Sequence, residues 1–123
     1  MAKRILLAED DEDNRDLVAF VMKRSQMDIE LLVAENGKEA VDLAIREVPD
    51  LILMDMQMPV MDGYQATQMI KSDSKTTHIP VIAFTAQAKP EDKERTLQVG
   101  CVEHYSKPMD PEELLAIIRK YLQ

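Results

Sequence analysis

The chain has 123 residues and a formal net charge of −8, and 46% of its residues are hydrophobic. This length and hydrophobic content fit one domain with a packed core and exclude a disordered chain. A single cysteine excludes an internal disulfide and a cysteine-rich zinc module, and it favours a reducing, cytoplasmic compartment. No apolar run approaches the roughly 20 residues of a membrane span, and the acidic balance disfavours direct nucleic-acid binding.

The first half of the chain alternates short apolar runs with helical patterns. An apolar run bounded by polar or turn residues predicts a buried strand, and apolar residues three or four positions apart predict a helix. The first run stops at the acidic segment 9–13, and the strongest run stops at Asp55. In chain order the predicted elements are strand 5–8, helix 13–24, strand 31–34, helix 40–45, strand 51–54 and helix 64–71.

The second half continues the alternation. Its predicted elements are strand 81–84, helix 90–99, strand 102–106 and helix 111–122. Pro90 fits the first turn of a helix, Gly100 a C-cap and Asp110 an N-cap. Strand and helix thus alternate five times, and continuous apolar strands imply a sheet that is covered on both faces. We therefore expect an α/β fold, a five-stranded parallel sheet with helices on both faces, in one domain that spans residues 1–123 with no output domain.

Polar residues at the strand ends predict the site. In open parallel sheets ligands bind outside the carboxyl ends of the strands. Glu9 and Asp10 follow the first strand, Asp55 the third, Thr85 the fourth and Lys107 the fifth. We therefore expect these five side chains to converge in one pocket.

The residue types in that pocket indicate phosphoryl chemistry. Crowded carboxylates repel one another unless a cation lies among them, and ligand sets made of oxygen favour Mg²⁺, with Mn²⁺ as a second option. A carboxylate such as Asp55 can attack phosphorus and form an acyl phosphate. Lys107 can neutralise a phosphoryl oxygen, and the Thr85 hydroxyl can donate to another.

Four motifs resemble the receiver (CheY-like) domain of two-component response regulators. They are Glu9-Asp10, the segment 50–63 around Asp55, Thr85-Ala86 and Lys107-Pro108, and the resemblance covers the whole chain. It implies a (βα)5 flavodoxin-like fold that accepts a phosphoryl group from a sensor histidine kinase or a histidine phosphotransfer protein. Within the family, the acidic run and the loop 56–59 look most similar to DivK-like regulators or hybrid-kinase receivers.

The resemblance also implies a role for each site residue. Asp55 would be the phosphoacceptor. Asp10 and Asp55 would bind Mg²⁺ directly, with Glu9 completing the acid pair and the backbone carbonyl of Gln57 as a third protein ligand. Thr85 and Lys107 would contact the phosphoryl group, which makes six residues in all around the metal and the phosphate.

The resemblance further implies a cis Lys107–Pro108 peptide and a conformational switch. An aromatic residue often stands three positions before the family's lysine, and here that position is His104, with Tyr105 beside it. Strand alternation places these two side chains on opposite faces, so His104 is the predicted switch residue and Tyr105 the alternative. The surface that changes would lie between residues 90 and 122.

The expected protein is a signalling phosphoacceptor rather than an enzyme, although it would assist its own phosphoryl transfer and autodephosphorylation. Because the last helix ends at residue 122, its output would be contact with a downstream protein. We expect a cytoplasmic monomer or weak dimer.

Other classes of protein fit parts of the pattern. An aspartyl-phosphate phosphohydrolase of the haloacid dehalogenase type needs a second Asp where Gln57 stands. A flavodoxin-like flavin carrier would hold its phosphate in an acidic pocket. An EF-hand loop at residues 11–16 has Asp16 where glycine is required, and a metal site at Cys101 and His104 has only His78 to supplement it.

Overall fold

The computed structural model describes residues 2–86 and 89–123, and in this part of the chain five strands alternate with five helices. The strands are β1 (Lys3–Ala8), β2 (Ile29–Ala34), β3 (Leu51–Asp55), β4 (Val81–Thr85) and β5 (Glu103–Ser106). The helices are α1 (Glu12–Ser25), α2 (Gly37–Glu47), α3 (Gly63–Ser72), α4 (Pro90–Gln98) and α5 (Pro111–Leu122). The predicted α/β fold is confirmed.

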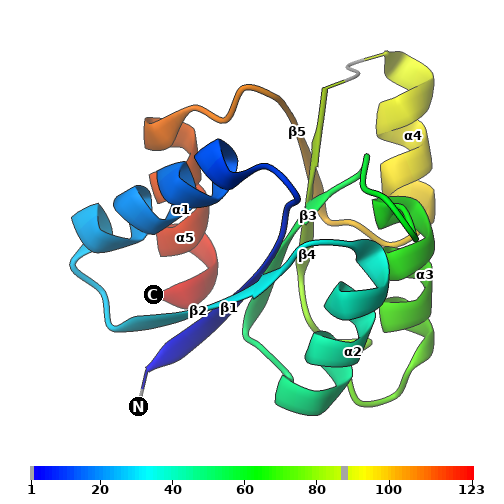
Figure 1. Cartoon of the computed structure of the whole chain (residues 1–123), viewed down its shortest axis with the longest axis horizontal. Coiled ribbons are helices and arrows are strands. Elements are labelled where there is room, and N and C mark those ends of the chain that lie inside the picture. Colours follow the sequence, from blue (N-terminus) through cyan, green and yellow to red (C-terminus); the bar gives the residue numbers. More distant parts are fainter. Residues whose placement is uncertain (1, 87–88) are drawn as a thin grey trace.

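All neighbouring strands pair in parallel, in the order β2-β1-β3-β4-β5 (Figure 1). The chain passes from β1 to β2 at one edge and then crosses back to place β3 on the other side of β1. The strand order therefore reverses between β1 and β3, and a ligand crevice is expected outside the carboxyl ends of these two strands. The acidic segment after β1 and Asp55 at the end of β3 lie at this point.

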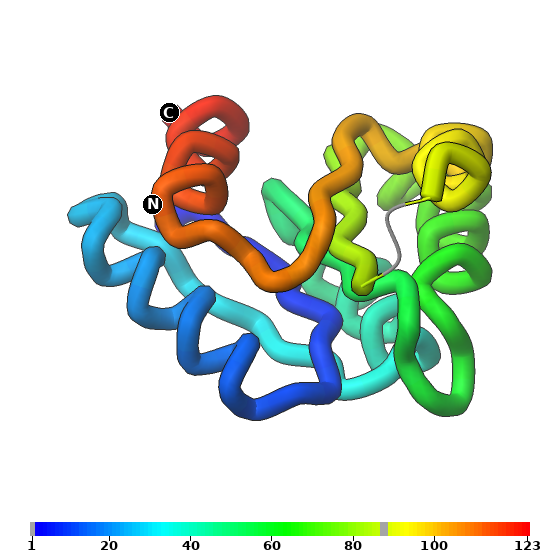
Figure 2. The backbone as a smooth tube through the Cα atoms, turned by 90° about the horizontal axis from the view of Figure 1, so that it is seen from above, coloured from blue at the N-terminus to red at the C-terminus, as the bar shows by residue number. Residues whose placement is uncertain are grey.

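Helices cover both faces of the sheet. Viewed from above, α1 and α5 lie on one side of the sheet and α2, α3 and α4 on the other (Figure 2). Each side has its own core: Leu51 and Leu53 of β3 join the core with α1 and α5, whereas Ile52 and Met54 join the other. Every residue of β3 is buried, which explains why its sequence is a continuous apolar run.

Side-chain caps fix the starts of the helices. Asp11, Asn36, Asp62 and Asp110 each accept a backbone N–H of the first turn of α1, α2, α3 and α5, respectively. The loop between β3 and α3 must return close to the strand, because a Cβ on Gly63 would lie 2.4 Å from the backbone oxygen of Asp55. Gly63 therefore positions α3 directly against the end of β3.

The element boundaries differ from the sequence prediction by a few residues. β2 begins at Ile29, two residues earlier than predicted, because it pairs with β1 from Lys3 onward. α2 extends over Gly37–Glu47 rather than 40–45 because the Asn36 cap lies just before it. The C-cap of α4 is Val99, and Gly100 follows with a φ of 112°, a conformation that glycine adopts without steric cost.

Candidate functional site

Three carboxylates meet at the carboxyl ends of β1 and β3, as the strand order requires. Oxygen atoms of Glu9, Asp10 and Asp55 lie within 4.8 Å of one another. Glu9 is 0% exposed and Asp55 is 3% exposed, whereas Asp10 is open to solvent. The structure therefore brings the predicted acidic residues together, two of them buried and one accessible.

Lys107 joins this cluster from the loop after β5. Its Nζ lies 2.7 Å from Oε1 of Glu9 and 2.9 Å from Oδ2 of Asp55. The Lys107–Pro108 peptide bond is cis, which confirms that prediction. A single ammonium group thus pairs with the two buried carboxylates, and Asp10 lies on the solvent side of the cluster.

The cluster shifts the pKa values of its members. Burial raises the pKa of Glu9, and the charge of Asp55 raises it further, while the hydrogen bond from Lys107 lowers it; the net direction is upward. Burial alone would lower the pKa of Lys107, but its hydrogen bonds to Glu9 and Asp55 raise it overall. Lys107 is therefore held in its charged form, whereas burial disfavours the negatively charged form of Glu9.

The side chain of Gln57 occupies a place that the sequence did not predict. Its backbone N–H donates to Oδ1 of Asp55 at 3.0 Å. Its carboxamide reaches β4, where Nε2 lies 2.9 Å and Oε1 3.1 Å from Oγ1 of Thr85, and Oε1 also accepts the N–H of Ala86 at 3.3 Å. The only sequence signal was its position two residues after Asp55, opposite the end of the neighbouring strand.

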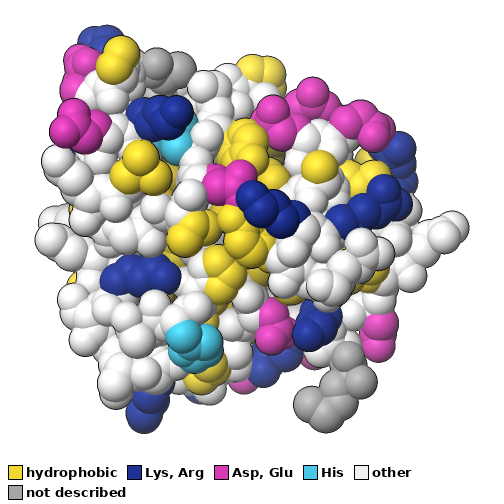
Figure 3. Space-filling view, turned by 180° about the vertical axis from the view of Figure 1, so that it is seen from behind, with side chains coloured by type: hydrophobic (Ala, Val, Ile, Leu, Met, Phe, Trp, Pro, Cys, Tyr) yellow, Lys and Arg dark blue, Asp and Glu magenta, His cyan; other side chains and the backbone are white. Residues whose placement is uncertain are grey.

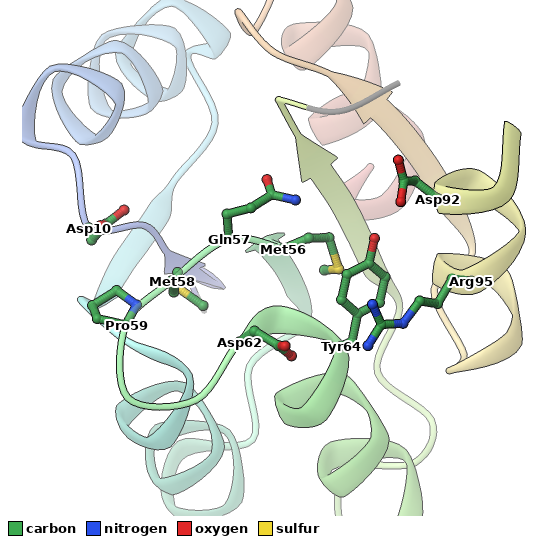
Figure 4. A pocket seen from close by; sticks show the side chains of 9 residues that line it. All are labelled: Asp10, Met56, Gln57, Met58, Pro59, Asp62, Tyr64, Asp92 and Arg95. Carbon is green, nitrogen blue, oxygen red and sulfur yellow. The ribbon is translucent and has the colours of Figure 1, made fainter. Parts of the chain in front are cut away.

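A cavity of about 510 Å³ opens beside the cluster (Figure 4). Its lining comes from the acidic segment, the loop between β3 and α3, and the helices α3 and α4: Asp10, Met56, Gln57, Met58, Pro59, Asp62, Tyr64, Asp92 and Arg95. The Arg95 guanidinium lies 3.8 Å from the centroid of the Tyr64 ring. This cation–π contact joins α3 to α4 across the wall of the cavity.

His104 and Tyr105 face opposite sides of β5, as strand alternation predicts. Nδ1 of His104 lies 3.2 Å from Oγ1 of Thr96 on α4, whereas the Tyr105 ring stacks on Phe84 of β4 with centroids 5.8 Å apart. Burial and the charge of Lys93 lower the pKa of His104, and Asp92 opposes them. Hydrophobic side chains gather in the middle of the face formed by α4, β5 and α5 (Figure 3).

The EF-hand-like segment and the Cys101–His104 pair, which the sequence offered as metal sites, have structural roles in the fold. Asp11, the first residue of the EF-hand-like segment, is the N-cap of α1. Cys101 is buried with its Sγ 3.9 Å from the hydroxyl of Thr67, so it and His104 contact different residues. Among the described residues, no helix is long and apolar enough to cross a membrane.

The donor set fits a divalent cation. Three carboxylates supply hard oxygen ligands that Mg²⁺ and Mn²⁺ prefer. One of the three is exposed, so a cation and its waters can approach from solvent. The sheet thus presents three acids at the point where its strand order reverses, together with a lysine from a cis-proline loop.

The chain belongs to the response regulator receiver domain family, whose model matches residues 5–119. It is therefore a two-component signalling domain with the CheY-like fold, not a haloacid dehalogenase-type phosphohydrolase or a flavin carrier. It is 41% identical over 122 residues to the polar-differentiation response regulator DivK of Brucella anthropi, covering 99% of this chain and 98% of that protein.

Solved structures agree with this assignment. The receiver domain of the sensor histidine kinase PA1611 of Pseudomonas aeruginosa, which has a magnesium ion coordinated in its active-site cleft, is 33% identical with a TM-score of 0.87, and the match covers 98% of each chain. The manganese-bound response regulator Rcp1 is 26% identical with a TM-score of 0.79, covering 96% of this chain and 90% of the other.

Proposed function

We propose that the chain is a phosphoacceptor whose phosphorylation site is Asp55. The observation that carries this proposal is the placement of the Asp55 carboxylate, which is 3% exposed, 2.9 Å from the Lys107 ammonium and beside two further acids. The donor would be a sensor histidine kinase or a histidine phosphotransfer protein, as is general in this family. The product would be an acyl phosphate on Asp55.

In the transfer step, an oxygen of Asp55 attacks the phosphorus of the donor. A new O–P bond forms while the bond from phosphorus to the donor's leaving atom breaks, and that atom keeps the electron pair. Lys107 faces the same carboxylate and would neutralise charge on a phosphoryl oxygen, and the Thr85 hydroxyl would donate to another. Attack by water on the phosphorus of the acyl phosphate would break its bond to Asp55, release inorganic phosphate and return the free carboxylate.

A divalent cation fits this site. Asp10, Asp55 and the backbone carbonyl of Gln57 would hold it, with Glu9 behind them, and Mg²⁺ is the first choice and Mn²⁺ the second. The oxygen-rich cluster supports this set, as does the magnesium ion of the related PA1611 receiver domain. The cation would lower the repulsion between the carboxylate and an approaching phosphoryl group.

The response surface would be the face of α4, β5 and α5. A phosphoryl group at Asp55 would draw the hydroxyl of Thr85 toward it, and the ring of His104 would fill the space that Thr85 leaves beside β4. Their positions on adjacent strands support this coupling, since Thr85 pairs with Ser106 and Ala83 with His104. A downstream protein would recognise the altered surface.

The proposal also covers how the domain acts in the cell. The match to DivK over nearly its full length supports a domain that signals through contact with other proteins. We place it in the cytoplasm, as its single cysteine suggests, as a monomer or weak dimer.

Labelling with acetyl phosphate and Mg²⁺ tests the phosphorylation site. The wild type should acquire one acid-stable, base-labile phosphoryl group, and the Asp55→Asn variant should acquire none. An Asp42→Asn variant, which changes an exposed acid on α2, is the matched control and should label normally. Retained labelling of Asp55→Asn would contradict the assignment.

A further inference from the structure

The carboxamide of Gln57 occupies the donors that the proposed phosphoryl site needs. Its Oε1 accepts the Ala86 N–H at 3.3 Å. The Thr85 hydroxyl lies within hydrogen-bonding distance of both ends of the carboxamide, 2.9 Å from Nε2 and 3.1 Å from Oε1. A carbonyl-type oxygen in this place is a neutral analogue of a phosphoryl oxygen. The donors at the end of β4 are therefore already engaged in the structure before any phosphate is present.

The two occupants compete for the same donors. The Ala86 N–H has one proton, so it cannot donate to Oε1 of Gln57 and to a phosphoryl oxygen at the same time. The same holds for the Thr85 hydroxyl when it donates to Oε1. We infer that Gln57 is a positioning residue: its carboxamide holds Thr85 and Ala86 in the unphosphorylated domain and must be displaced when a phosphoryl group arrives. This inference rests on the proposed phosphorylation of Asp55.

The cavity beside the site gives the displaced side chain a place to go. Gln57 lines it together with Asp92 of α4 (Figure 4). Within residues 2–86 and 89–123, Oδ2 of Asp92 is buried and has no hydrogen-bond partner. An amide N–H₂ that leaves Thr85 can donate to such an acceptor, so the displacement need not leave the carboxamide unpaired.

Binding of beryllofluoride, a phosphoryl analogue, tests the inference in the whole chain with Mg²⁺. Because the chain has no tryptophan, affinity is best measured by titration calorimetry. Gln57→Ala removes the competitor but keeps the backbone carbonyl, so beryllofluoride should bind about fivefold more tightly, the value of one net hydrogen bond. Gln57→Glu keeps an acceptor and adds negative charge, so binding should weaken by about the same factor.

A double-mutant cycle separates competition from simple opening of the site. In a Thr85→Ala background, Gln57→Ala should still tighten binding, because the Ala86 N–H remains contested, but by less than it does beside Thr85. Gln65→Ala, which truncates an exposed glutamine on α3, is the matched control and should leave the affinity unchanged.

The outcomes distinguish this inference from the proposed function. Asp55-dependent binding of beryllofluoride with no gain in Gln57→Ala would overturn the role of Gln57 and leave the phosphoacceptor intact. The same gain with and without Thr85 would also overturn it, since the effect would then be steric. No Asp55-dependent binding in the wild type would overturn both.

Discussion

Lys107 sets the charge balance among the buried acids. It faces Glu9 and Asp55 at hydrogen-bonding distance, and its hydrogen bond is what opposes the upward pull of burial on the pKa of Glu9. Without the ammonium, Glu9 would keep its burial and its repulsion from Asp55. Its pKa would therefore rise further, and the protein would favour a protonated Glu9.

The Lys107→Ala variant should fold but lose stability in a pH-dependent way. A group whose folded pKa is raised contributes its stability at low pH and loses it as the pH rises. We therefore expect a loss of about 1–3 kcal/mol near pH 8 and a smaller loss near about pH 5, because protonation of Glu9 relieves its buried charge as the pH falls. Urea unfolding at the two pH values measures both.

An exposed lysine supplies the control for this experiment. Lys38→Ala, at the start of α2, removes the same charge away from the cluster and should change the unfolding free energy by less than about 0.5 kcal/mol at either pH. Equal losses at both pH values in Lys107→Ala would show that Lys107 acts through packing rather than charge.

The acidic cluster could be predicted from the sequence, and the Gln57 contact could not. The carboxyl ends of parallel strands meet at one edge of a sheet, so the positions of Glu9 and Asp55 follow from the strand pattern alone. Gln57 lies in a loop and is exposed, and no periodicity fixes the rotamer of such a side chain. Its contact with Thr85 depends on which way the carboxamide turns.

At the scale of elements, a carboxylate network ties β5 to α5. Glu103 accepts hydrogen bonds from the hydroxyls of Tyr105 and Tyr121 and from Nζ of Lys120. Burial would raise the pKa of Glu103, but these hydrogen bonds lower it overall. The hydrogen bond to Glu103 and burial raise the pKa of Tyr105 to about 12. Burial, and to a smaller extent the hydrogen bond to Glu103, raise the pKa of Tyr121 to about 12.

Glu103→Gln should bring both phenols back toward their ordinary pKa. The neutral amide removes the charge that opposes ionisation, so Tyr105 and Tyr121 should ionise at lower pH than in the wild type. Alkaline absorbance titration follows them directly, because the chain has three tyrosines and no tryptophan. Tyr64 lies on α3 and is the internal control. An unchanged titration curve would contradict the network.

Gly63 is the element-scale constraint on the site itself. A Cβ there would lie 2.4 Å from the Asp55 carbonyl oxygen and 2.8 Å from the Met56 Cα, and backbone atoms cannot move aside as a flexible side chain can. Gly63→Ala should therefore lower the unfolding free energy by about 1–3 kcal/mol and slow labelling of Asp55. Gln65→Ala, two residues along α3 and exposed, should do neither. Normal labelling of Gly63→Ala would contradict the constraint.

The sequence identified all the elements of the described fold but not all of their limits. N-caps such as Asp110 could be predicted from the sequence, because the capping residue directly precedes the helix whose N–H it accepts. The start of β2 was not, because Ile29 and Glu30 become strand only through pairing with Lys3 and Arg4. A boundary fixed by a partner strand carries no local signal, which is why β2 began earlier than its apolar pattern indicated.

At the scale of the whole molecule, one strand, β4, lies between the strand that carries Asp55 and the edge strand of the proposed response surface. Asp55 ends β3, Thr85 ends β4, and His104 lies on the edge strand β5 and contacts Thr96 of α4. A change at Asp55 can therefore reach α4 across two adjacent strands. His104 is the member of this path whose side chain is an imidazole, the group that can change its charge under mild conditions. The charge of His104 therefore reports a change along the path.

The pKa of His104 should fall when beryllofluoride binds. Burial and Lys93 already lower it, and an inward movement of the ring would bury it further and disfavour the imidazolium. Since the free state then binds more protons, beryllofluoride should bind more weakly near about pH 6 than near about pH 8, and His104→Phe should reduce this dependence. NMR titration of the two histidines measures the pKa of His104 with the exposed His78 as the internal reference. If Asp55-dependent binding left the pKa of His104 unchanged, the path would not run through its ring, and Tyr105 on the opposite face of β5 would become the switch residue to test.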